Sequence, residues 1–283
     1  MTDAPRSFAV GDARVTVLHD GTIALDGGAM FGVVPRVVWE KRDPPDDRNR
    51  VTLGLNVALI KSGGKRVLVD TGMGERWTEK EVRMYRIDRS TTLLGGLRAC
   101  GLGPEDIDVV VNTHLHFDHS GGNTRLEGGR VVPAFPRARY VVQGGEWDDA
   151  NHPHERNRAS YRADDFVPLA DAGQLDLIEG EAEVAPGVRA VPVGGHTTHH
   201  QMVVVASGGE TLVVPTDLLP TASHLPLPFV MGYDLFPVAT LEAKRKLLES
   251  AAEGGWRILF YHDARTPLGR VRRDGEGYTL EVA

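Results

Sequence analysis

The chain has 283 residues, of which 41% are hydrophobic, and it carries a formal net charge of −7. This length and apolar content suffice for a large core, and the acidic balance disfavours nucleic acid as a partner because a polyanion would be repelled. No apolar run approaches 18 residues and residues 1–10 lack an apolar signal region, so we expect a cytoplasmic protein with no membrane partner.

The first elements along the chain are a strand and a glycine-rich segment. Residues 14–19 alternate apolar and polar side chains, and the Asp20-Gly21 pair that follows predicts the turn of a first hairpin. Met30 and Phe31 lie among the glycines of residues 26–35, and a tryptophan follows at position 39. Large apolar side chains in such a segment indicate an ordered loop at about 26–50 that could cover a pocket, although a loop that packs only on its own core fits the pattern equally well.

A second hairpin and a helix follow. Residues 51–60 and 66–70 predict two strands joined by a turn at 62–65. Asp70 ends the second strand, where its carboxylate could orient a metal-bound histidine or simply cap the turn. Residues 91–100 predict a short helix, and we expect Cys100, the only cysteine, to be a buried structural thiol.

The sequence T-H-L-H-F-D-H-S-G-G at 113–122 carries most of the chemical information. It follows a β-branched run at 107–111 that predicts a buried strand. His114 and His116 point the same way if this segment is extended, whereas His119 points away and can serve a second ion. Imidazole and carboxylate ligands without a thiolate suit Zn, Mn, Fe or Co, so the cluster predicts a metal site rather than a solvated loop.

The second half of the chain alternates strands with short loops. A charged segment at about 151–170 predicts a surface insertion, in which we expect His152 and His154 to be solvated rather than metal-bound. An amphipathic helix is predicted over residues 241–252. Strands are predicted at 139–143, 188–193, 202–206, 211–214 and 257–261.

One pattern recurs along the whole chain. An apolar strand is followed by a metal-competent side chain at His114, His196, Asp217 and His262. Functional sites of layered α/β folds are built at strand ends, so we expect these four residues to meet.

The sequence H-L-H-F-D-H at 114–119 resembles the H-x-H-x-D-H signature of the metallo-β-lactamase-fold hydrolases. The resemblance implies an α/β fold, an αββα sandwich, formed by residues 1–283 as a single domain. It also implies a site for two divalent ions, with zinc expected and Mn, Fe or Co as alternatives, and catalytic roles for Asp118 and Asp217. The implied ligands are His114, His116 and His196 for the first ion, Asp118, His119 and His262 for the second, and Asp217 as the bridge.

Three further segments resemble quorum-quenching lactonases of the same superfamily, which open N-acyl-homoserine lactones: residues 26–35, 216–221 and 260–264. Other lactonases of the superfamily carry a tyrosine three residues after the bridging aspartate, where this chain has Pro220. Tyr233 and His224 are candidates for the missing hydrogen-bond donor. Met30 and Phe31 are candidates for the wall that would bind the acyl tail of a small-molecule substrate.

The alternatives are hydrolases that use the same metals. A phosphotriesterase or arylesterase would use the same metals and an apolar pocket. A thioester hydrolase of the glyoxalase type would need basic residues near the C-terminus, and the context of Arg270, Arg272 and Arg273 indicates a surface strand instead. A non-enzymatic, metal-binding structural protein would be favoured by a missing ligand, and all seven are present. The oligomeric state stays open, with a homodimer among the alternatives.

Overall fold

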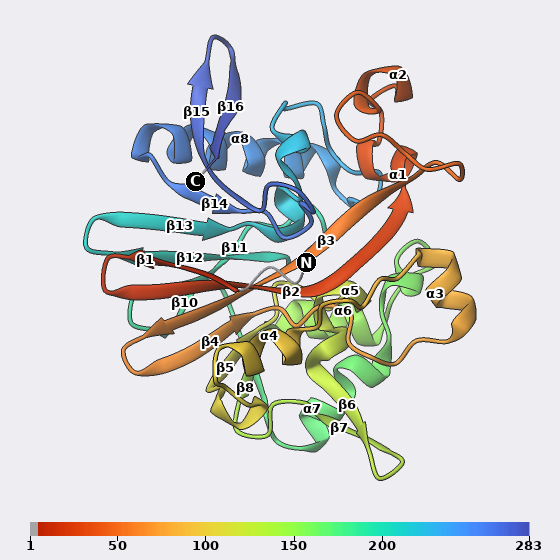
Figure 1. Ribbon diagram of the computed structural model, residues 1–283, viewed down its shortest axis with the longest axis vertical. Coiled ribbons are helices and arrows are strands. Elements are labelled where there is room, and N and C mark those ends of the chain that lie inside the picture. Colours follow the sequence, from red (N-terminus) through yellow and green to blue (C-terminus); the bar gives the residue numbers. More distant parts are fainter. Residues whose placement is uncertain (1–4, 283) are drawn as a thin grey trace.

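The computed structural model describes residues 5–282, and two seven-stranded sheets lie face to face in it (Figure 1). The first sheet has the order β1-β2-β3-β4-β5-β8-β9, with bounds Arg6–Val10, Ala13–Asp26, Arg50–Ser62, Lys65–Val69, Val109–Val111, Arg139–Gln143 and Leu175–Ile178. The second runs from β10 to β16 in sequence order, with bounds Ala182–Ala185, Val188–Pro192, Gln201–Ser207, Glu210–Val214, Arg257–Leu259, Leu268–Asp274 and Gly277–Val282. A separate hairpin is formed by β6 and β7, Thr124–Glu127 and Arg130–Pro133.

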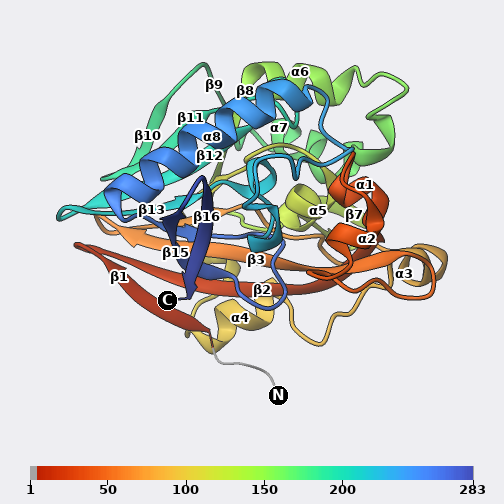
Figure 2. The same cartoon turned by 90° about the horizontal axis from the view of Figure 1, so that it is seen from above.

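Helices cover the two outer faces of this pair of sheets. Helix α8 lies along the second sheet (Figure 2), whereas α4, α6 and α7 lie on the side of the first sheet (Figure 1). The helices α1 to α8 span Gly27–Phe31, Arg36–Trp39, Glu79–Tyr85, Leu93–Ala99, Phe117–Ser120, Gly144–Asn151, Val167–Asp171 and Pro237–Gly254. None of the helices in residues 5–282 has both the length and the apolar character needed to cross a bilayer.

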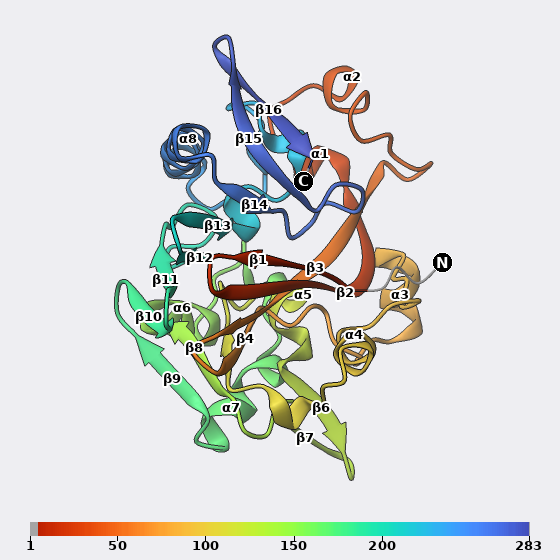
Figure 3. The same ribbon diagram turned by 60° about the vertical axis from the view of Figure 1, so that its left-hand side comes forward.

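The alternation of side chains along the strands produces three buried interfaces. In β12, Val203 and Val205 join the core between the sheets, whereas Val204 faces α8 and packs in the same cluster as Leu247 and Leu248. In β5, Val110 points the other way, toward the helices of the first sheet. Since neighbouring residues of a strand face opposite sides, strands that are apolar on both faces must be covered on both. The result is four layers, which are seen edge-on in Figure 3, and the predicted αββα sandwich is confirmed.

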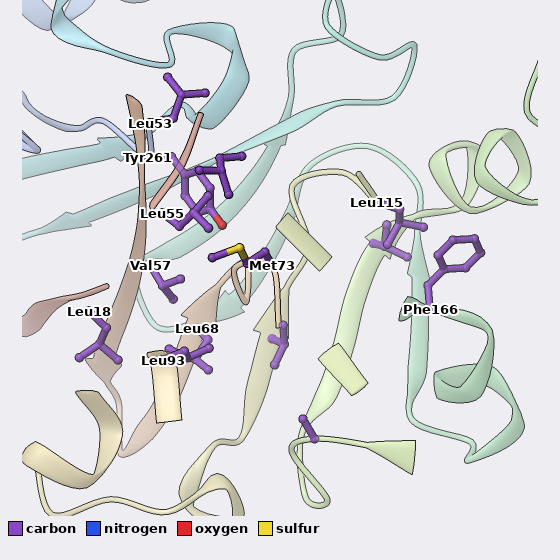
Figure 4. Close-up of a cluster of buried hydrophobic side chains, with 14 of the residues drawn as sticks. Leu18, Leu53, Leu55, Val57, Leu68, Met73, Leu93, Leu115, Phe166 and Tyr261 are labelled. Atoms are coloured by element: carbon purple, nitrogen blue, oxygen red, sulfur yellow. The ribbon is translucent and has the colours of Figure 1, made fainter. Parts of the chain in front are cut away.

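The cluster between the first sheet and its helices reaches the site described below. Figure 4 shows Leu18, Val57 and Leu93 on the left of this cluster, Leu115 and Phe166 on the right, and Tyr261 above Val57. The Tyr261 hydroxyl donates to the backbone carbonyl of Asp118 over 2.7 Å. The apolar core therefore extends up to the backbone of the H-L-H-F-D-H segment.

The expected turn at Asp20-Gly21 is wrong, because β2 continues through both residues. The pairing of β2 with β3 shifts register between His19 and Thr22, so the strand absorbs these residues as a bulge. The Asp20 carboxylate turns inward and accepts hydrogen bonds from the backbone N–H groups of Met73, Gly74 and Leu93. The first hairpin instead joins β1 to β2, and the second joins β3 to β4 as predicted.

Three other expectations have mixed outcomes. The segment 26–50 contains two short helices, α1 and α2, within the ordered loop expected there. Cys100 is exposed at the end of α4, so its predicted burial is wrong. The segment 151–170 is exposed in its first part, but Asn157, Phe166 and Leu169 are buried, so it is more than a surface insertion.

Candidate metal centre and cavity

The segment between β5 and β6 carries four of the predicted ligands. It enters α5 directly after His116, so that Asp118 and His119 lie on a single helical turn. Gly121 and Gly122 then pass close to the backbone that follows β4. A Cβ atom at Gly121 would lie 2.3 Å from the carbonyl oxygen of Met73, and one at Gly122 would lie 2.2 Å from that of Thr71. Only glycine allows this approach, which is the structural reason for the S-G-G that ends the motif.

The seven predicted ligands converge at one end of the two sheets. Their ligand atoms form three overlapping groups, each within 4.8 Å: His114, His116 and His196; His114, His119 and Asp217; and Asp118, His119 and His262. Asp217 lies between the groups. Its Oδ1 is 3.1 Å from Nε2 of His119 and 3.2 Å from Nε2 of His262, and its Oδ2 is 3.2 Å from Nε2 of His196.

The chemistry of this donor set fits divalent cations. Nε2 of His114 and Nε2 of His116 are buried and have no hydrogen-bond partner in the described residues. Burial lowers the pKa values of His114 and His116 well below 6.5, so both imidazoles are neutral and have a lone pair for a metal. Burial opposes ionisation of Asp217, but the surrounding imidazoles lower the pKa of its carboxyl group well below its usual range.

The ring nitrogens that face away from the centre are held by the protein. Nδ1 of His119 lies 2.9 Å from Oδ2 of Asp70, which agrees with the first of the two roles expected for Asp70, and Nδ1 of His196 lies 2.8 Å from Oδ1 of Asp234. Nδ1 of His262 donates to the carbonyl of Gly54 over 3.1 Å. Such contacts fix the tautomer and the orientation of metal-binding imidazoles. Sequence reasoning missed Asp234, because it lies in a proline-rich loop that carries no ligand motif.

Glu146 is a second carboxylate that sequence reasoning missed. It lies at the start of α6, is fully buried, and accepts hydrogen bonds from three segments that are distant in sequence. The donors are the backbone N–H of Leu115 at 3.0 Å, the hydroxyl of Tyr161 at 3.1 Å and the hydroxyl of Thr197 at 2.6 Å. Burial raises the pKa of this carboxyl group, while the three donors oppose that shift. Glu146 therefore joins both histidine-bearing loops to the segment around Tyr161.

The two histidines that follow His196 have supporting positions. Nε2 of His200 lies 2.9 Å from the hydroxyl of Thr216, next to Asp217. The ring of His199 packs over Gly145, where a Cβ atom would lie 2.3 Å from it. Neither belongs to a ligand group among the described residues.

A cavity of about 450 Å³ opens over the ligands. Its floor includes His116, Asp118, His196, Asp217 and His262. One wall is apolar and comprises Leu25, Met30, Leu53, Met231 and Leu235. The remaining lining is aromatic or polar and includes Tyr85, Phe117, Tyr233, Arg156, Asn157 and Ser160.

Of the four predicted substrate-binding residues, two line the cavity and two do not. Met30 and Tyr233 line the cavity, whereas Phe31 and His224 are buried behind its wall. The Phe31 ring stacks on Trp39 at 5.1 Å and on His224 at 4.8 Å. Burial lowers the pKa of His224 to about 3, and its Nε2 donates to the carbonyl of Met30 over 2.9 Å. In this arrangement Phe31 and His224 hold Met30 in place and do not face the cavity.

Buried histidine and aspartate ligands at one end of an αββα sandwich, below an open cavity, define the chain as a metal-dependent hydrolase. The sequence profile of the metallo-beta-lactamase superfamily matches residues 51–262. The chain belongs to this superfamily, since the match covers most of its length.

Individual relatives agree with this assignment. A probable metal-dependent hydrolase from Staphylococcus aureus is 31% identical, with a TM-score of 0.90 over 97% of this chain and 99% of that one. An N-acyl homoserine lactonase of Bacillus cereus is 29% identical over 237 residues, which are 78% of this chain and 86% of the relative. AidC, a dizinc quorum-quenching lactonase, is 21% identical with a TM-score of 0.82, over 99% of this chain and 97% of that one, which shows a shared fold.

The contact between Asp234 and His196 predicts the effect of removing a carboxylate that binds no metal itself. Asp234→Ala should weaken metal retention by about 10- to 100-fold, because His196 loses the partner that fixes its ring. Metal content after dialysis against graded chelator concentrations measures this change. Asp176→Ala, on the distant strand β9, is the matched control. Equal retention by both variants would show that Asp234 does not orient His196.

Proposed function

We propose that this hydrolase binds two zinc ions and opens the ester ring of N-acyl-homoserine lactones, a quorum-quenching activity. The observation that carries the proposal is the position of Asp217, between two ligand groups on the floor of a cavity with an apolar wall. The N-acyl homoserine lactonases among the relatives support the choice of substrate. The cytoplasmic location remains a prediction from the sequence alone.

The chemistry divides between the metals and the side chains. When bound, two zinc ions would polarise the ester carbonyl and acidify a water molecule. His114, His116 and His196 would hold one ion, and Asp118, His119 and His262 would hold the other. Asp217 would set their spacing. Asp118 lies on the cavity floor, where its carboxylate could take a proton from the attacking water and pass it to the departing alkoxide.

The cavity also suits the shape of such a substrate. Its volume lies within the usual range for small-molecule sites. The apolar wall can bind an alkyl tail, while the carboxylates and imidazoles of the floor face the reacting ester. The three arginines near the C-terminus lie on β15 and contribute nothing to the cavity lining, which disfavours a glutathione thioester. A phosphotriester or aryl ester is the remaining competitor.

Metal analysis combined with a substrate panel tests the proposal. Reconstituted protein should approach two zinc ions per chain and should hydrolyse N-acyl-homoserine lactones with a higher kcat/KM than aryl esters, thioesters, phosphotriesters or β-lactams. A content that stays near one ion per chain would contradict the two-metal site. A clear preference for phosphotriesters at full metal content would contradict the proposed substrate.

Asp118→Asn tests the proton-transfer role. The amide cannot take up the proton, so kcat for lactone opening should fall by about 10²- to 10⁴-fold, while KM changes little. Steady-state kinetics at equal metal content measure the effect. Asp12→Asn, in the exposed turn between β1 and β2, serves as the control. If kcat is preserved with the metal in place, another group moves the proton.

Met30→Ala tests whether the apolar wall binds the tail. Burial of a methylene contributes about 0.8 kcal/mol, which corresponds to about a fourfold change in the binding constant per carbon. The variant should therefore lose more kcat/KM for long-chain than for short-chain lactones. Phe31 is unsuitable for this test because, unlike Met30, it does not line the cavity. A loss that is uniform across chain lengths would place the tail elsewhere.

A further inference from the structure

We propose that Arg156 and Asn157 form a subsite that recognises the amide group of an N-acyl lactone. Both residues line the cavity, in a segment whose sequence indicates only a surface insertion. The inference rests on the proposed lactonase function and extends it, because it names the group that would distinguish N-acyl lactones from lactones that carry an alkyl chain alone.

The segment that carries these residues is fixed on both sides. Nη2 of Arg156 donates to the carbonyl oxygens of Gly232 at 2.8 Å and Asp234 at 3.2 Å, next to the cavity residue Tyr233. At the other end, Tyr161 donates to Glu146 and pairs with His116 in an isolated β-bridge. These contacts fix the position of the segment relative to two metal ligands. The contact with His116 is direct, and the contact with His196 runs through Asp234. A preorganised site of this kind loses little entropy when a ligand binds.

The Arg156 guanidinium has N–H donors that its contacts with the protein do not use. Within residues 5–282 it forms no ion pair with a carboxylate, in contrast to Arg50, Arg76 and Arg265. Its two hydrogen bonds to the protein use Nη2 alone, whereas a guanidinium offers five N–H groups. The remaining donors can bind an acceptor oxygen in the cavity.

Asn157 supplies the complementary chemistry. It lies on the cavity wall although only 6% of its surface is exposed, and its buried Oδ1 has no hydrogen-bond partner in the described residues. A buried, unpaired polar group is costly, so its presence calls for an explanation. A side-chain amide can donate and accept, whereas a guanidinium can only donate.

The pair therefore matches a ligand group that has an acceptor oxygen and an N–H donor on neighbouring atoms. A secondary amide has both, whereas an ester lacks the N–H and an alkyl chain lacks both. The acyl amide of an N-acyl-homoserine lactone joins the ring to the tail. It would lie between the metal ligands of the floor and the apolar wall, where the lining residues Arg156 and Asn157 can reach it.

Two lactones that differ in this amide test the subsite. N-octanoyl-homoserine lactone is compared with a γ-lactone that carries an eight-carbon alkyl chain, using zinc-loaded wild type, Asn157→Leu, Arg156→Met and Arg158→Met. Wild type should prefer the N-acyl lactone. Asn157→Leu and Arg156→Met should each lose about tenfold more kcat/KM on the N-acyl lactone than on the alkyl lactone. Arg158 is exposed on the same segment and does not line the cavity, so Arg158→Met should behave as wild type.

The outcomes separate the two proposals. If wild type opens neither lactone, the proposed function fails. If wild type opens both and Asn157→Leu loses equally on the two substrates, the lactonase function stands and the amide subsite is wrong. Asn157→Leu is decisive because Oδ1 of Asn157 has no hydrogen-bond partner to lose within the described residues, whereas Arg156→Met also releases the loop around Gly232.

Discussion

The Asp217 carboxylate, placed between imidazoles on both sides, is the constraint on which the rest of the site depends. Its two oxygens lie 3.1 to 3.2 Å from nitrogens of His119, His196 and His262, which come from three different loops. A buried carboxylate and so many buried imidazoles would be costly without compensating charge. Divalent cations remove that cost, so metal binding and the packing of the loops are expected to depend on each other.

Three further carboxylates keep these loops in place. Asp70 and Asp234 orient the two imidazoles His119 and His196, and Glu146 ties the backbone of Leu115 to the segment around Thr197. Each is buried and each accepts hydrogen bonds from groups far away in the sequence, as buried charges require. The positions of the ligands are thus set by a shell of buried carboxyl groups that itself depends on the four-layer fold.

The difference between local motifs and long-range contacts explains how much of the structure could be predicted from the sequence alone. The H-L-H-F-D-H motif is a local signal, and its resemblance to the metallo-β-lactamase-fold hydrolases implies the four layers and the seven ligands. Strand patterning alone places only four candidate residues at strand ends. Asp234 and Glu146 act only through contacts that the folded chain creates, and nothing beside them in the sequence marks them. At the Asp20-Gly21 pair, by contrast, a local signal was present but predicted the wrong structure. The local turn preference of the pair is overridden because three backbone N–H groups need the Asp20 carboxylate inside.

The cavity wall is built from other kinds of elements than the floor. The floor consists of ligands at strand ends, whereas much of the wall comes from the α1 segment, the segment at 154–161 and the loop at 229–235. These parts touch one another: Gly232 donates its N–H to the carbonyl of Ala29, and Arg156 donates to the carbonyl of Gly232. A substitution in one of them can therefore shift the other two while the metal ligands keep their strand-end positions. Selectivity for the substrate can accordingly change in this chain without any change in the chemistry of the floor.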